Sequence, residues 1–305
     1  MRIPARGPAA GATALVTVLL AAVTGCSPSG PSDGDDGDDG SKLLTALGRL
    51  ADDSATKDVT FLDAVRVRKL SKGDAKRFTQ VSQPASPLLN PYQPGLLGQQ
   101  FEVTQINTAI DTGEAGHWSG SFDESAITKS LKSNGYTQTE KDGRTVWAHP
   151  GDTGATLQVS EDEISYSTRD SDSMAAVDPQ EGSSLADHKD FRRAAECLGD
   201  VYRADYNPLS SSNPVRLAAL GQQASSAAKN TEILCFVVKD DAAAGSLESD
   251  LRAVVSAESP TFDGTKVTVE KGDRPLVRAV VPDSATQRPG RLIISDVELW
   301  MTAAQ

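Results

Sequence analysis

The chain has 305 residues, with 30 lysines and arginines against 42 aspartates and glutamates, and its formal net charge is −12. A chain this acidic repels nucleic-acid phosphates, so we expect no nucleic-acid partner. It also repels anionic lipid headgroups, so surface charge cannot hold it on a membrane. The length is enough for two modest domains.

The first 25 residues have the order of a signal peptide. Arg2 and Arg6 precede an apolar run from about Ala9 to Val23, and small residues follow up to Cys26. The apolar part has about 15 residues, which is shorter than the roughly 20 that a membrane-spanning helix needs. We therefore expect residues 1–25 to be removed.

The small residues before a cysteine, Val23-Thr24-Gly25-Cys26, resemble the lipobox of bacterial lipoproteins. Val23 departs from the leucine most common at that position, and the resemblance covers only the first 26 residues. It implies that the Cys26 thiol receives a diacylglyceryl group and becomes the mature N-terminus. Two acyl chains suffice to anchor a protein to the cell membrane, here on the extracytoplasmic side. The alternative is an ordinary secretory signal with a chance cysteine.

Residues 26–40 are predicted to be a disordered tether, because the run Asp33–Gly40 alternates acids with glycine and offers no apolar residue to a core. A calcium loop is the other interpretation. It fails because Gly37 stands where an EF-hand needs a ligand and no glutamate follows at the required offset. We expect a solvated spacer and no metal site.

The first folded half is expected over residues 41–178, as an antiparallel α+β layer. Ser41 can begin a helix that carries Leu43, Leu44, Leu47 and Leu50 at helical spacing. Asp123 can cap a second helix, which Asn134-Gly135 ends. Extended segments are expected at 59–67, 101–110, 118–122, 136–140, 144–148, 156–160 and 163–168.

A proline-rich passage, Pro84–Leu97, interrupts this half. Its prolines exclude regular structure, yet it keeps five large apolar residues. Either these side chains pack back onto the domain, which is the favoured interpretation, or they offer an apolar patch to a partner. As a candidate contact surface they are Leu88, Leu89, Tyr92, Leu96 and Leu97.

The second half is expected over residues 184–305, again as α+β. A helix over Leu185–Tyr202 carries Cys197 beside its apolar stripe, and the buried-looking strand Ile233–Val238 carries Cys235. In an oxidising compartment two cysteines pair more readily than they bind metal, so we expect a Cys197–Cys235 disulfide. Two buried thiols are the alternative. The other expected elements are a strand at 217–221, a helix at 243–257 and extended segments at 266–270, 276–281 and 291–301.

The two halves share an order of elements, although their residue identity is negligible. The segment Trp118–Phe122, the helix that follows it and the strands to residue 168 correspond to 231–238, the helix 243–257 and the strands to residue 301. This order suggests a structural duplication. The layout of the second half also resembles, in a general way, the soluble domains of actinobacterial-type envelope lipoproteins of unassigned role.

Residues with catalytic chemistry are sparse. His117, His149 and His188 do not stand at metal-ligand spacing, and we expect no cofactor. Ser119 lies in Gly-x-x-Ser-Gly, which is not a nucleophile elbow. Trp118 and Trp147 could line a ligand groove, but their place in strand-like segments favours packing in the core.

These features favour a non-catalytic protein that is anchored to the membrane through Cys26 and binds an envelope protein or a small ligand. The alternative is an extracytoplasmic hydrolase whose site is assembled from residues distant in sequence. A buried His–Ser pair or a cleft with convergent carboxylates would favour the hydrolase. A broad apolar groove would favour binding.

Overall fold

The computed structural model describes residues 39–89, 95–141, 143–150, 154–168 and 173–304. They belong to one compact unit, Asp38–Gln305. The predicted signal peptide, Cys26, nearly all of the predicted tether and Tyr92 lie outside the described residues.

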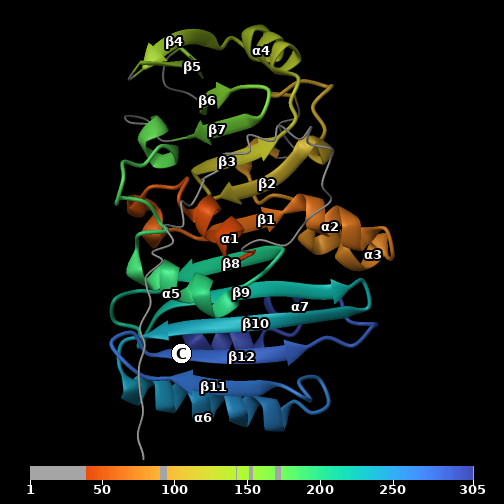
Figure 1. Ribbon diagram of the computed structural model, residues 1–305, viewed down its shortest axis with the longest axis vertical. Helices are drawn as coiled ribbons and strands as arrows, with labels where there is room; N and C mark the ends of the chain where they lie inside the picture. Colours follow the sequence, from red (N-terminus) through yellow and green to blue (C-terminus); the bar gives the residue numbers. More distant parts are fainter. Residues whose placement is uncertain (1–38, 90–94, 142, 151–153, 169–172, 305) are drawn as a thin grey trace, which may run out of the picture. The chain divides into compact units, whose positions relative to one another are not determined.

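Twelve strands of the described residues form a single sheet, and every neighbouring pair is antiparallel (Figure 1). The predicted α+β class with packed helices is confirmed. In spatial order the strands are β11 (Lys266–Glu270), β12 (Leu276–Pro282), β10 (Lys229–Val238), β9 (Val215–Ser226), β8 (Arg203–Pro208), β1 (Val59–Asp63), β2 (Ile106–Asp111), β3 (Ala115–Gly120), β7 (Glu163–Ser167), β6 (Thr156–Val159), β5 (Arg144–Ala148) and β4 (Thr137–Lys141).

The two halves of the sequence meet within this sheet. Strand β1 of the first half pairs with β8 of the second, with Val59 opposite Tyr206 and Phe61 opposite Ala204. The segments predicted as separate domains, 41–178 and 184–305, therefore contribute to one continuous sheet.

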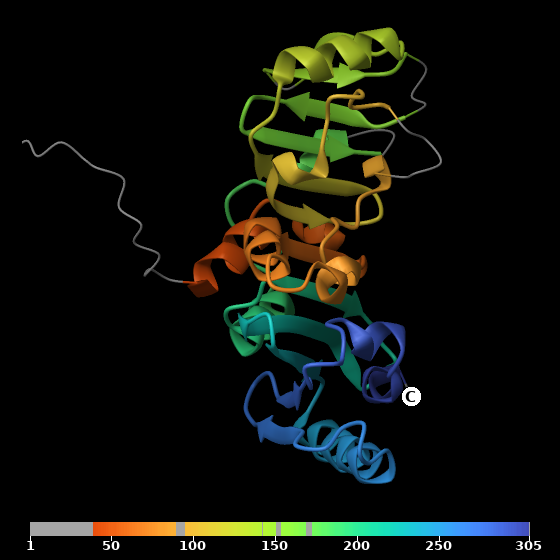
Figure 2. The ribbon, with the colours of Figure 1, turned by 90° about the vertical axis from the view of Figure 1, so that its right-hand side faces the viewer.

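The helices cover both faces of the sheet (Figure 2). On one face α1 and α5 pack over the central strands, with Leu43 and Leu47 of α1 and Phe191 and Leu198 of α5 in a shared core. On the opposite face α4 and α6 cover separate cores towards the two ends. The helices are α1 (Asp39–Leu47), α2 (Ala64–Ser71), α3 (Ala75–Phe78), α4 (Glu124–Ser133), α5 (Lys189–Leu198), α6 (Asp241–Ala257), α7 (Arg291–Ile294) and α8 (Glu298–Met301).

The two halves repeat one topology. Each has a helix (α1 or α5), a three-stranded meander (β1–β2–β3 or β8–β9–β10), a second helix (α4 or α6) and returning strands, of which the last pairs with the third strand of the meander. The first half has the extra hairpin β4–β5. The strand order is therefore the same in both halves, with β3 matching β10 and α4 matching α6. This agrees with the duplication suggested by the sequence.

The register of the strands allows the two halves to be compared residue by residue. The β1–β8 pairing is unchanged when Val59 is exchanged with Ala204 and Phe61 with Tyr206, and it is equally unchanged when Phe61 is exchanged with Ala204. Under the first exchange, residues reached by the same pairings from Phe61 and from Tyr206 correspond. They are Ile110 with Ala219, His117 with Cys235, and Ser165 with Arg278.

The sequence-based prediction is wrong at both short apolar runs that form helices. Val65 and Val67, expected in extended sequence, lie in α2, because Asp63 accepts a hydrogen bond from the Arg66 N–H and caps a helix there. Residues 291–301, also expected to be extended, form α7 and α8. Strand β8 falls within residues to which the sequence assigned no strand.

Candidate functional site

A cleft of about 310 Å³ lies between α1 and the face of the sheet formed by β2, β3 and β7. Its floor is made of Thr108 and Ile110 from β2 and His117 and Ser119 from β3. Glu163 of β7 stands at its edge. Its wall comes from Lys42, Thr45, Ala46 and Arg49. We call it the α1 cleft.

Helix periodicity explains this wall. Lys42, Thr45, Ala46 and Arg49 are spaced i, i+3, i+4 and i+7, so they share one face of α1 and of the turn that follows it. The leucines face the core instead. The same helix thus anchors itself through its leucines and turns two cations towards the cleft.

His117 is the buried polar group of the cleft floor. Its Nδ1 lies 2.9 Å from the Ser165 Oγ, and its Nε2 lies 3.8 Å from the Glu163 Oε1. Burial, with the positive charge of Arg49, lowers the pKa of His117 to about 4. The imidazole is therefore neutral near pH 7, and the nitrogen not used by Ser165 is directed towards Glu163 at the edge of the cleft.

Each of the two cations at the lip pairs with a carboxylate, of which Glu163 is half-exposed and Asp63 is buried. Arg49 contacts the Glu163 carboxylate at 3.2 Å, with both side chains more than 40% exposed. Lys42 lies 3.4 Å from the Asp63 carboxylate, whose other oxygen caps α2. The exposed Arg49–Glu163 pair contributes little, about 0–1 kcal/mol, so a bound ligand can replace it.

A second, larger cavity of about 640 Å³ adjoins the cleft and shares Glu163 with it. It opens where β5 and β6 diverge, since these strands pair only at Trp147 and Leu157. Ser165 lines this cavity, whereas its partner His117 lines the α1 cleft. The His117–Ser165 contact is thus a polar connection between the two spaces.

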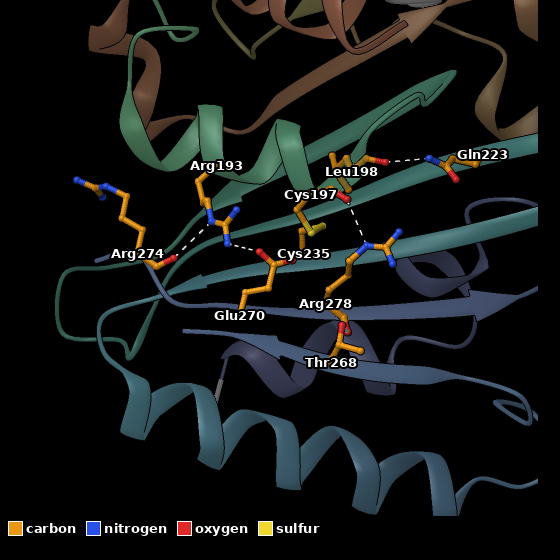
Figure 3. Close-up of a disulfide and its surroundings, with 9 residues drawn as sticks. All are labelled: Arg193, Cys197, Leu198, Gln223, Cys235, Thr268, Glu270, Arg274 and Arg278. Carbon is orange, nitrogen blue, oxygen red and sulfur yellow. Dashed lines mark hydrogen bonds and ion pairs between the residues drawn. A yellow bond between two sulfur atoms is a disulfide. The ribbon is translucent and has the colours of Figure 1, made fainter. Parts of the chain in front are cut away.

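The corresponding place in the second half is closed by the Cys197–Cys235 disulfide, which confirms the predicted pair (Figure 3). Cys235 lies on β10, the counterpart of β3 that carries His117, and Cys197 lies on α5, the counterpart of α1. Hydrogen bonds from Gln223 to the Leu198 carbonyl and from Arg278 to the Cys197 carbonyl hold the end of α5 as well. Where the second half has a covalent link, the first half has a cleft.

A buried carboxyl lies on the opposite face of the sheet. Asp111 Oδ1 accepts hydrogen bonds from the Trp118 Nε1–H at 2.8 Å and from the Tyr166 hydroxyl at 2.7 Å. Its Oδ2 has no hydrogen-bond partner among the described residues. Burial raises the pKa of Asp111 to about 7. None of the cavities described above reaches it, so we assign it a structural role.

The two tryptophans that could line a groove have different surroundings. Trp118 is fully buried against Tyr166, whereas Trp147 is buried beneath the Lys132 ammonium group, 5.3 Å from its ring centre, and lines the larger cavity. Of the proline-rich passage, Leu97 is buried, while Leu88, Leu89 and Leu96 are partly buried against the same core. These positions agree with the packing alternative, and a partner contact there stays a prediction.

The histidines have different surroundings. His149 Nδ1 contacts the Pro150 carbonyl, and His188 precedes α5 with its ring against Phe191. Only His117 contributes to the cleft. Ser119 also lies there, but its hydroxyl contacts Thr108 at 2.6 Å. No local pattern predicts the His117–Ser165 contact, because the two residues are 48 positions apart on non-consecutive strands.

Three features of the described residues weigh against a hydrolytic role for the His117–Ser165 pair. Ser165 lies inside the ladder on both sides, opposite His117 and Gln158, so its backbone N–H belongs to the sheet and cannot donate to an oxyanion. An imidazole with so low a pKa is also a weak general base. Glu163 is engaged by Arg49 and lies beyond hydrogen-bond distance of the imidazole.

Within the part of the chain that the structure describes, no group of three or more His, Cys, Asp or Glu residues is arranged to hold a metal ion. None of its helices combines the length and apolar character needed to cross a membrane.

No family model, curated protein or solved structure was found to match this chain. The chemistry of the α1 cleft therefore provides the functional evidence.

Proposed function

We propose that this protein is a lipid-anchored, extracytoplasmic binding protein and that the α1 cleft is its ligand site. The anchor rests on the resemblance of Val23–Cys26 to a lipobox. The ligand site rests on one structural observation: an open cleft lined by cations, hydroxyls and a buried neutral imidazole lies between α1 and β3, whereas a disulfide links their counterparts α5 and β10 in the other half.

The cleft has the size and composition of a small-molecule site. Its volume is at the lower end of the roughly 300–1,000 Å³ typical of such sites, and it combines apolar floor atoms with a few convergent polar groups. The floor is rigid, because β2 and β3 are internal strands of the sheet. A preformed site loses less entropy when a ligand binds.

Ligand-induced stabilisation tests this function. The Cys26→Ser chain is heated with a panel of phosphates, carboxylates, sugars and amino acids, and the same panel is applied to His117→Phe. At a concentration 100 times the Kd, a ligand adds about 2.7 kcal/mol of stability. We expect at least one compound to stabilise the first protein and not the variant. Equal stabilisation of both would place the ligand elsewhere.

The buried His117–Ser165 contact favours a second candidate, an extracytoplasmic hydrolase with Ser165 as nucleophile. A fluorophosphonate probe separates the two functions. A binding protein leaves Ser165 unlabelled, whereas a hydrolase forms an adduct that disappears in Ser165→Ala.

A further inference from the structure

We infer that the ligand of the α1 cleft carries an oxyanion, a carboxylate or a phosphate group, which lies between Arg49, Lys42 and the Nε2 edge of His117. This inference rests on the proposed binding function and specifies its ligand class. It begins from a contrast in charge. The whole chain has a net charge of −12, yet the lining of the cleft contains two cations and one acid.

The donors of the cleft converge from both sides. Arg49 and Lys42 approach from the wall, and the hydroxyls of Thr45, Thr108 and Ser119 come from the wall and the floor. Arginine is suited to this role, because its planar guanidinium can donate two parallel hydrogen bonds to a carboxylate or a phosphate.

The floor supplies a further donor. When the Ser165 hydroxyl donates to His117 Nδ1, the proton of the neutral imidazole resides on Nε2. That N–H has no acceptor within hydrogen-bond distance on Glu163, because the Oε1 atom is 3.8 Å away. It is therefore free to donate to a ligand oxygen that enters the cleft.

A metal ion fits this site poorly. His117 Nε2 and Glu163 Oε1 are close enough to share a cation, but the Arg49 guanidinium lies 3.2 Å from the same carboxylate. A divalent cation would have to displace that positive charge, whereas an oxyanion is attracted by it. Glu163 is thus a competitor of the ligand, and its removal should favour binding.

Because Glu163 competes with the ligand for Arg49, the two variants should change the affinity in opposite directions. The Cys26→Ser chain is titrated with inorganic phosphate, succinate and glucose, with the imidazole ¹⁵N resonances of His117 as the reporter. We expect phosphate or succinate, but not glucose, to shift them. Arg49→Ala should weaken that binding about tenfold, because it removes a charge-assisted contact. Glu163→Gln should strengthen it about threefold, because it removes the competing carboxylate.

The chain provides a matched control for both changes. Arg252 and Glu248 form an exposed ion pair on α6, away from the cleft. Arg252→Ala and Glu248→Gln change the net charge by the same amounts, so we expect each to leave the Kd within about twofold. Thermal melts of all four variants confirm that each is folded. Vesicles of phosphatidylglycerol, compared with phosphatidylcholine, show whether a lipid headgroup can supply the phosphate.

The outcomes are distinct. A shift by glucose without a shift by phosphate, succinate or phosphatidylglycerol overturns the oxyanion and leaves the binding function standing. Weaker phosphate or succinate binding in Glu163→Gln also overturns it, because the carboxylate would then be a ligand contact. If the wider stability panel finds no ligand that depends on His117 either, the proposed function fails as well.

Discussion

His117 and Cys235 lie on corresponding strands in the two halves of the sheet. Each lies on the third strand of its meander, and each is reached from the central β1–β8 pair by the same pairings. Cys235 is bonded to Cys197 of α5, whereas His117 lies at the floor of a cleft beside α1. A single topology thus provides a covalently closed half and an open half.

Removal of the disulfide should lower stability without affecting the cleft. The bond closes a loop of 38 positions, which contributes roughly 3–4 kcal/mol in the chain-entropy model. We expect Cys197→Ala/Cys235→Ala to lose a large part of that stability in urea unfolding while the His117 resonances stay in place. Intact mass should rise by two hydrogens per disulfide on reduction, and an unchanged mass would show that the thiols are free.

Asp111 should make the protein less stable as pH rises. Its pKa is raised to about 7 in the folded state, against an ordinary value of 3.8, so the folded state holds a proton between pH 4 and 7 that the unfolded state releases. The groups that face it are Tyr166, Trp118 and Arg203. Asp111→Asn should remove this dependence of stability on pH. It should raise the free energy of unfolding above pH 7 by up to roughly 4 kcal/mol, less any loss from an unpaired amide. Urea unfolding at pH 4, 5.5 and 7.5 measures it, and parallel curves for both proteins would contradict it.

His117, in contrast, should make the protein less stable as pH falls. Its pKa is lowered to about 4 from an ordinary 6.5, so between these pH values the unfolded state binds a proton that the folded state does not bind. The free energy of unfolding therefore falls as pH drops from 6.5 towards 4. Arg49, Lys42, Glu163 and Ser165 are the groups around it. His117→Gln should abolish a slope worth roughly 3 kcal/mol over that range. His149→Gln is the control, and an equal effect there would remove the assignment to His117.

The proline-rich passage should be needed for stability. Leu97 is buried, so Leu97→Ala should cost roughly 2–4 kcal/mol, and Leu88→Ala should cost less because it is half-buried. Thermal melts compare the two variants. If the triple change Leu88→Ser, Leu89→Ser and Tyr92→Ser leaves the melting temperature unchanged but abolishes binding of an envelope partner, the passage is a contact surface instead.

The anchor is tested by fractionation. Cys26→Ser should move the protein from the membrane fraction to the soluble fraction, because the apolar leader is too short to span a bilayer and the acyl chains would have no attachment point. Labelling with a radioactive fatty acid gives the direct readout. Undiminished labelling of Cys26→Ser would show that the lipid, if any, is attached elsewhere.

Local patterns in the sequence predicted most helices and strands, because period and capping residues identify them. Lys266–Glu270 is a strand within the expected bounds, and Asp123 caps α4 through the Ala126 N–H as expected. The failures came where a short apolar run suits either structure. Val65 and Val67 are helical because Asp63 caps α2. Residues 291–294 are helical where the buried Glu232 carboxylate accepts hydrogen bonds from the Gly290 and Arg291 N–H groups at the start of α7.

The cleft could not be predicted from the sequence, because its parts are brought together only by the pairing order of the strands. β3 pairs with β7, after an intervening helix and three strands, and this pairing places Ser165 beside His117. The disulfide could be predicted because, once Cys26 is assigned to the lipid anchor, the two remaining cysteines allow one pairing. No comparable restriction applies to one of three histidines and one of many serines.

The crystal structure of the Cys26→Ser chain soaked with the ligand found by the stability panel tests most directly whether the α1 cleft is a binding site. We predict intact ligand between α1 and β3, with one of its oxygens within hydrogen-bond distance of His117 Nε2 and Ser165 unmodified. Ligand density elsewhere with only water in the cleft, or a cleaved ligand attached to Ser165, would contradict this assignment.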